Sequence, residues 1–276
     1  FKSVNSAFLA EALGNVPDNP STTYSPGRDG YFNPFGAGVA NDRTVLDFIS
    51  QGYSFRLDRS RSASANLVAS GPLMTLPGGD LDLAVGVQAR RESLATRARI
   101  LTSSTTPREI VEPEYERTVR SVFAEARIPL VGPANARTGV ERLELTAAAR
   151  FEDYDDFGST TNPKIGAVWS PAHGWNLRAS YGTSFRAPAL TQMFDASAAT
   201  MTTVPRSDGL RIVSIYRYGG NPDLQPESAT TWTAGFDYAA EGGARFSLGY
   251  FDTRFSDRIN QPVNENLQAV LTDPSL

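Results

Sequence analysis

The chain has 276 residues, of which 40% are hydrophobic and 20% charged, a composition typical of a folded protein rather than of a disordered one. Its 26 Lys and Arg against 30 Asp and Glu give a net charge of -4, which argues against a nucleic-acid-binding protein. With no cysteine and one histidine, thiol catalysis, disulfides and metal sites built on Cys or His clusters are excluded. That histidine, His173, lies in a Pro-Ala-His-Gly stretch that predicts a tight turn, so we predict no catalytic residue and no cofactor.

The first part of the chain, residues 1–60, contains closely spaced Pro, Gly and Asn residues that interrupt regular structure. Short helices are predicted around 6–13 and 44–50. A structureless stretch of this length is unusual inside a compact domain, so we predict a long loop region on the surface, of the extracellular type found on β-barrels.

From residue 62 onward, apolar residues recur at every second position, which is typical of strands with two different faces. Turn signals near Pro77, Gly132, Ala172 and Gly242 join these runs into four hairpins. The predicted pairs are 63–71 with 81–89, 121–130 with 142–151, 165–169 with 175–181, and 230–238 with 246–250. The alternation slips at Phe251-Asp252, where either a β-bulge or the end of an apolar zone explains the pattern.

The predicted connections alternate in length. Those at the four turns are short, whereas the connections 100–114, 153–162 and 185–227 are long. No run approaches the ~18 apolar residues of a transmembrane helix, but a transmembrane strand needs only about 9–11 residues with every second one facing lipid. Short turns on one side and long loops on the other are typical of an outer-membrane barrel. A half-buried soluble sheet gives the same alternation of faces and remains the alternative.

The two faces of the predicted strands differ in chemistry. One carries aliphatic and aromatic residues, which suits lipid, and the other carries Arg, Glu, Gln, Asn and Ser, which suits a wet lumen. On the polar face we expect arginines to form fixed forks to Glu125 or Glu144 across neighbouring strands. The arginines in question are Arg90, Arg127, Arg150 and Arg178.

Three stretches carry a resemblance to a known family. Residues 151–166 (FEDYDDFGSTTNPKIG), 177–188 (LRASYGTSFRAP) and 221–227 (NPDLQPE) resemble, in order and spacing, the barrel of TonB-dependent outer-membrane receptors. The match is clearest over residues 60–258, and 32–36 resembles an extracellular-loop motif of the same receptors.

The resemblance implies an all-β fold, an antiparallel transmembrane barrel of about 22 strands closed by a plug. The roughly nine strands expected here fill less than half of such a barrel, so an internal barrel fragment is expected: a loop region 1–60, strands over 61–258, and the start of a further loop or strand over 259–276.

The implied function is energy-coupled uptake of a scarce nutrient, such as a ferric siderophore or an oligosaccharide, in the outer membrane of a Gram-negative bacterium. The implied partners are outer-membrane lipid, the TonB energy-coupling protein acting through a plug domain, and the small-molecule or oligosaccharide ligand. Neither nucleic-acid binding nor enzymatic activity is implied.

Ligand capture is expected in the loops, where aromatic rings and guanidinium groups occur together. The candidate residues are Tyr24, Arg28, Tyr216, Arg217 and Tyr218. Arg186, at a strand exit, is expected to form a salt bridge at the rim rather than to contact ligand. The carboxylates between Glu152 and Asp156 form either a solvated loop or a calcium site.

Two other functions remain open on the sequence. One is a passive porin-like channel. The other is a soluble β-rich carbohydrate-binding module or glycosidase that would use the carboxylates between Glu152 and Asp156.

Overall fold

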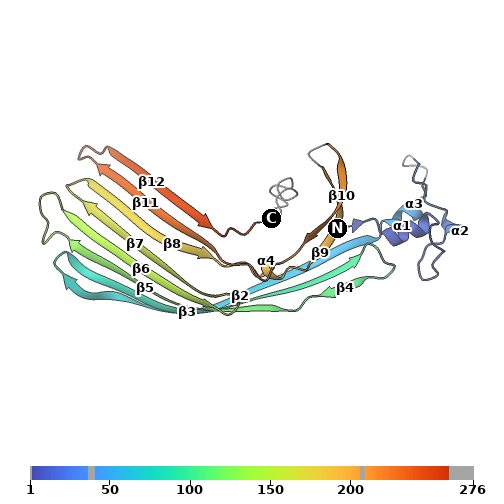
Figure 1. The fold of residues 1–276 in the computed structure, drawn as a ribbon, viewed down its shortest axis with the longest axis horizontal. Coiled ribbons are helices and arrows are strands. Elements are labelled where there is room, and N and C mark those ends of the chain that lie inside the picture. The colour runs from blue at the N-terminus through green and yellow to red at the C-terminus, as the bar shows by residue number, and fades with distance from the viewer. Residues whose placement is uncertain (1, 37–40, 206–208, 261–276) are drawn as a thin grey trace. The chain divides into compact units, whose positions relative to one another are not determined.

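The computed structural model describes residues 2–36, 41–205 and 209–260, and antiparallel strands dominate it (Figure 1). In this part of the chain, one sheet of ten strands has the order β1-β2-β3-β5-β6-β7-β8-β11-β12, with β4 paired to β3. Its strands are β1 (Lys2–Ser3), β2 (Gly52–Leu76), β3 (Gly79–Leu101), β4 (Arg108–Val111), β5 (Tyr115–Val131), β6 (Arg142–Tyr154), β7 (Gly158–Ser170), β8 (Trp175–Arg186), β11 (Glu227–Ala239) and β12 (Arg245–Ser256). Neighbouring strands follow one another along the chain, and within the described ranges the sheet does not close on itself.

Two further strands pair only with each other among the described residues. β9 (Ala198–Pro205) and β10 (Arg211–Tyr218) form an antiparallel hairpin inside the long connection between β8 and β11. The helices are α1 (Ser6–Ala12), α2 (Pro26–Asp29), α3 (Arg43–Ile49) and α4 (Leu190–Phe194). None of these described helices has the length and apolar character needed to cross a bilayer.

The chain divides into two compact units. The first comprises residues 1–61 and 93–115, and the second comprises 62–92 and 116–276. Strand β2 begins at Gly52, inside the region predicted to be loop. Tyr53, Phe55 and Leu57 alternate there with polar residues, so the apolar alternation begins before residue 62, where it was predicted to start.

The first unit has a small core of its own. The Asn5 side chain caps α1 by accepting hydrogen bonds from the backbone N–H groups of Ala7 and Phe8, and its amide donates to the Leu101 carbonyl at 3.1 Å. The rings of Phe8 and Tyr24 both stack on Phe48, with centroids 4.6 and 4.4 Å away. The region 1–60 is therefore more ordered than a chain of turns, because aromatic residues far apart in sequence pack together.

The second unit contains the predicted hairpins in the predicted order. Strands β5 and β6 pair from Val119–Tyr154 to Val131–Leu143, and β11 pairs with β12 from Ser228–Ser256 to Ala239–Arg245. In the latter pair the register runs through Trp232–Asp252 without a shift, so the slip at Phe251-Asp252 is not a bulge. The apolar zone ends there instead.

Aromatic residues form two rows on the apolar face of the second unit. Near the long-loop end, Tyr181 and Trp232 pack with ring centroids 4.4 Å apart, and near the short turns Trp175 packs on Tyr238 at 5.0 Å. Tyr181 and Trp175 are six residues apart on β8, which corresponds to about 20 Å along a strand. A band of that height between aromatic rows is close to the apolar belt of a transmembrane barrel.

Candidate functional site

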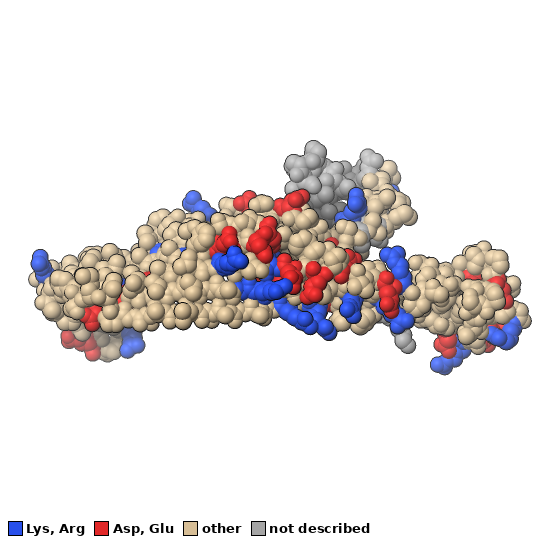
Figure 2. Space-filling view, turned by 90° about the horizontal axis from the view of Figure 1, so that it is seen from below, with Lys and Arg blue, Asp and Glu red and all other residues tan. Residues whose placement is uncertain are grey.

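The charged face of the second unit is built from arginine–carboxylate pairs, some between neighbouring strands and some within one strand. Arg127 on β5 pairs with Asp82 on β3 at 2.5 Å and with Glu144 on β6 at 3.2 Å, so it spans two strand interfaces. Figure 2 shows the molecule from below, where most of the surface is uncharged and the basic and acidic side chains near the middle of the view lie next to one another. The predicted pairing of an arginine with Glu144 across neighbouring strands is confirmed, as a single hydrogen bond rather than a fork, whereas Glu125 forms no ion pair with an arginine in the described part of the chain.

The other three predicted arginines pair with carboxylates other than Glu125 and Glu144, and two of these pairs lie within one strand. Arg150 contacts Glu152 at 2.9 Å, Arg90 contacts Glu92 at 2.9 Å, and Arg178 pairs with Asp237. Because each guanidinium has a carboxylate partner, this face presents little uncompensated charge to a ligand. The pairs therefore act chiefly to stiffen the polar face of the sheet, which is called the wall below.

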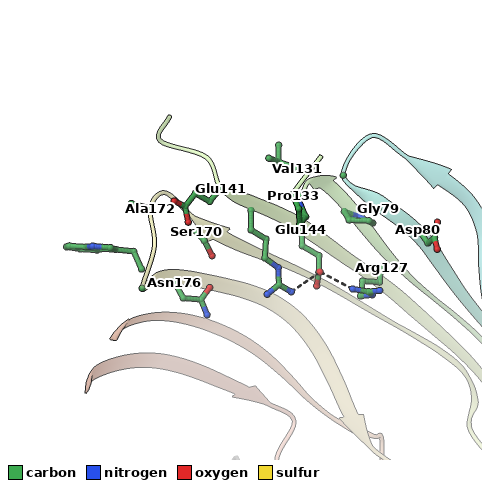
Figure 3. Close-up of a pocket in the computed structure, with 16 residues that line it drawn as sticks. Gly79, Asp80, Arg127, Val131, Pro133, Glu141, Glu144, Ser170, Ala172 and Asn176 are labelled. Atoms are coloured by element: carbon green, nitrogen blue, oxygen red, sulfur yellow. Dashed lines mark hydrogen bonds and ion pairs between the residues drawn. The ribbon is translucent and has the colours of Figure 1, made fainter. Parts of the chain in front are cut away.

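A polar cavity of about 600 Å³ opens on this face beside the short turns (Figure 3). Glu144 lies at its centre with a side chain that is only 10% exposed, and it accepts charge-assisted hydrogen bonds from Arg127 and Arg142. Asp80, Glu141 and Asn176 complete the polar lining. Since both arginines are satisfied by the wall itself, the cavity suits a polar surface packed against it better than a free anion.

At the opposite end of the strands, where the long loops begin, Arg186 is the last residue of β8. Its guanidinium forms two hydrogen bonds to Glu227, at 2.6 and 2.8 Å, across the first register pair of β8 and β11. The Arg186 hydrogen bond, together with one from the backbone N–H of Ile259, lowers the pKa of Glu227 to about 2. The predicted rim salt bridge at Arg186 is thus confirmed.

The acidic stretch after β6 does not converge on one point. Glu152 faces Arg150, the Asp155 carboxylate accepts from the Thr118 backbone N–H at 3.0 Å, and Asp156 pairs with Arg117 at 2.8 Å. Among the described residues no group of three or more His, Asp or Glu side chains is arranged to hold a metal ion. The calcium alternative therefore has no geometric support here.

Arg117 forms the most enclosed polar cluster of the second unit. Its side chain is 2% exposed and pairs with Asp156 at 2.8 Å and with Glu92 at 3.7 Å. It also donates to the Pro188 carbonyl at 2.7 Å, and its guanidinium carbon lies 5.7 Å from the centre of the Tyr154 ring. Sequence reasoning missed this residue because an arginine on the polar face of a strand resembles every other lumen arginine in the pattern.

The predicted ligand residues fall in two places. Arg217 and Tyr218 lie on β10, opposite Ala199 and Ala198, and both side chains are exposed. The Tyr216 backbone belongs to the same strand, but its side chain lies outside the described ones. These three predicted residues thus belong to one hairpin.

Tyr24 and Arg28 belong to the first unit. Tyr24 is 3% exposed, and its hydroxyl donates to the Gly30 carbonyl at 2.5 Å, so its ring is part of the core. Burial raises the pKa of Tyr24. Arg28 is mostly exposed and pairs with Asp29 at 2.7 Å, and the hydrogen bond from Arg28 lowers the pKa of Asp29 to about 2.

Comparison with known proteins identifies a matching family. A family model described as "TonB dependent receptor-like, beta-barrel" matches residues 7–270. Among curated proteins, the iron-regulated outer membrane virulence protein of Vibrio cholerae is 26% identical over 224 residues, which is 81% of this chain and 29% of the relative. The vitamin B12 transporter BtuB of the same species is 27% identical over 133 residues, covering 48% of this chain and 18% of the relative.

A solved structure agrees in fold. A mutant of the ferric enterobactin receptor of Pseudomonas aeruginosa, in complex with enterobactin, matches with a TM-score of 0.54 and 17% identity over 72% of this chain and 27% of that one. The chain thus spans less than a third of the length of each of these three proteins.

Proposed function

Because the chain belongs to the TonB-dependent receptor family of β-barrel proteins, we propose that it forms part of the barrel of an outer-membrane receptor that imports a scarce nutrient. The family match over residues 7–270 carries this proposal. Members of the family are outer-membrane proteins of Gram-negative bacteria, and the matched proteins include a vitamin B12 transporter and a ferric enterobactin receptor.

The two faces of the sheet support this assignment. On the apolar face, Leu248 and Tyr250 between the aromatic rows are exposed by 62% and 65%, and Trp232 in one row by 56%, which suits contact with lipid. The opposite face, with its arginine–carboxylate pairs, would line the wet interior, and the cavity at Glu144 would face a plug domain. In this arrangement the TonB protein would act through that plug, and the segments 1–60, 61–258 and 259–276 would be loop, barrel wall and a further loop or strand.

The ligand we propose is an anionic, carbon-rich compound such as a ferric siderophore. The β9–β10 hairpin supports this choice because one of its faces carries Arg211 and Arg217 at the two ends and exposed aliphatic side chains between them. Met201 and Ile215, opposite each other, are 74% and 67% exposed. An oligosaccharide is the second candidate, but it is favoured less because flat aromatic platforms are not found on that face.

The proposal is tested by uptake in a strain lacking the gene that encodes this chain. The complete gene product should restore uptake of iron-55-labelled ferric enterobactin only when TonB is present. Uptake without TonB would contradict the receptor assignment, whereas TonB-dependent uptake of cyanocobalamin but not of ferric enterobactin would retain the receptor and overturn the siderophore. Cell fractionation should place the protein in the outer membrane.

A further inference from the structure

In the long connection between β8 and β11, the outgoing and returning parts of the chain are hydrogen-bonded to each other. After α4, the chain leaves through Asp195 and returns at Gly220, whose backbone N–H donates to the Asp195 carbonyl at 2.9 Å. The next residue, Asn221, donates from its backbone to the Gln192 carbonyl at 2.9 Å. The β9–β10 hairpin is therefore carried on a base whose two arms are hydrogen-bonded to each other.

Where the chain returns, at Gly219 and Gly220, the close approach to the other arm leaves room only for glycine. A Cβ on Gly220 would lie 2.4 Å from the Met193 carbonyl oxygen and 2.5 Å from the Asp195 nitrogen, both of which are backbone atoms that cannot swing away. Gly219 has φ +150°, and a Cβ there would lie 2.7 Å from the Cα of Ser197. The approach of the two arms is thus set by backbone contact.

The outgoing arm is fixed to the sheet by Arg117. One guanidinium nitrogen donates to the Pro188 carbonyl at 2.7 Å and lies 3.7 Å from the Met193 sulfur, so it contacts the chain on both sides of the start of α4. The same group is held from the sheet side by Asp156 at 2.8 Å and by Glu92 at 3.7 Å. Leu190 and Met193 are 8% and 3% exposed, so α4 packs against the protein through two buried side chains.

From these contacts we propose that Arg117 is a positioning residue: it fixes the base of the 187–221 segment to the barrel wall and so presents the β9–β10 hairpin in one place, ready for ligand. The last clause rests on the proposed function, whereas the fixing of the base does not. A planar guanidinium serves both sides at once because its nitrogens point in fixed directions, which an ammonium group cannot reproduce.

Arg150, on the same polar face, provides a matched control for Arg117. It is also a polar-face arginine with a carboxylate partner, Glu152 at 2.9 Å, and it contacts Gln88 at 2.7 Å and Ser121 at 2.9 Å. All of these partners belong to the sheet, and none lies in the 187–221 segment. Removing its charge should weaken the wall without freeing the hairpin.

The test uses the complete gene product in detergent with a nitroxide spin label on Thr203→Cys, an exposed hairpin position. The 276 residues contain no cysteine, and any cysteine elsewhere in the gene product is first replaced by serine. The label should be more mobile in Arg117→Gln and in Arg117→Lys than in the parent protein, while Arg150→Gln leaves the spectrum unchanged. Unchanged mobility in Arg117→Gln, or full retention of the parent spectrum in Arg117→Lys, would overturn the proposal.

A second variant covers the case in which Arg117→Gln does not fold. Gly220→Ala leaves the arginine cluster intact and forces the two arms apart, so it should also mobilise the label; an immobile label there would contradict the closed base. Binding of ferric enterobactin is measured separately. If the hairpin is correctly placed only about a tenth of the time, the apparent Kd should rise about tenfold in Arg117→Gln. If the parent protein binds none of this probe, the siderophore proposal fails while the label still decides the role of Arg117.

Discussion

At the scale of single residues, Glu144 shows how the wall holds its charges. One carboxylate, largely buried, serves two arginines from different positions on the sheet, so losing its charge leaves both guanidinium groups with poorer partners. Arg127 keeps Asp82, but Arg142 has no other ion pair among the described residues.

We expect Glu144→Gln to lower the free energy of unfolding of the complete protein by about 1–3 kcal/mol, the usual value of charge-assisted hydrogen bonds. The shape of the side chain is retained, so the effect reports the charge. Denaturant titration in detergent measures it. Glu125→Gln is the control, because Glu125 has no arginine partner in the described structure, and an equal loss in both variants would contradict the role of Glu144.

The ion pair between Glu227 and Arg186 at the rim should make the stability of the protein depend on pH. Its pKa is about 2 in the folded protein against an ordinary value of 4.5, so the Arg186 pair stabilises fully above pH 4.5 and is lost as the pH falls toward 2. The Tm difference between the parent and Glu227→Gln should therefore be largest near neutral pH and vanish near pH 2. A difference that stays constant over this range would show that the pair does not titrate as described.

At the scale of elements, strand β12 marks the edge of the apolar band. Leu248 and Tyr250 lie on the apolar face, whereas Asp252 and Arg254, which continue the same face, form an ion pair at 3.3 Å. The change occurs beside Trp232, the aromatic residue paired with Asp252. The band that would meet lipid therefore ends between Tyr250 and Asp252.

A charge placed inside this band should be costly. Leu248→Arg is expected to destabilise the membrane-inserted protein by about 2–4 kcal/mol, the cost of an arginine on the lipid face near the bilayer midplane. Phe251→Arg, on the opposite face of the same strand, is the control and should have little effect. Unfolding of the complete protein in lipid vesicles, followed by its heat-dependent gel mobility, measures both. Similar stabilities would mean that lipid does not cover this face.

The sequence predicts elements well where one face is apolar and poorly elsewhere. The hairpins from β5 to β8 and from β11 to β12 follow from alternation, because burial or lipid contact imposes a period of two. The β9–β10 hairpin carries polar residues on both faces, so no period marks it. The start of β2 does alternate, but the polar run 58–62 separates it from the rest of the strand. Likewise, the rim pair at Arg186 was predictable from its place at a strand exit, whereas the burial of Arg117 depends on α4, whose position no local pattern encodes.

At the scale of the whole molecule, the sheet combines an apolar face with two unpaired edges. Within the described residues, β1 and β12 each have one neighbour, and the apolar face of the second unit leaves large side chains exposed. Such a surface is unstable in water, because both the edges and the apolar face favour association with other chains.

The 276-residue chain expressed alone should therefore aggregate in detergent-free buffer and remain dispersed only in detergent or lipid. Size-exclusion chromatography with light scattering, with and without detergent, provides the measurement. A soluble monomer without detergent would contradict the membrane assignment and would favour a soluble β-sheet protein.

The closed base below the β9–β10 hairpin also bears on how such a receptor can diversify. Because the two arms meet at Asp195 and Gly220 and are anchored below that point by Arg117, the residues between them can be exchanged, lengthened or shortened without altering the strands that carry them. New ligand preferences can then arise by replacement of the segment between Asp195 and Gly220, while the barrel strands remain under selection for folding and membrane insertion alone.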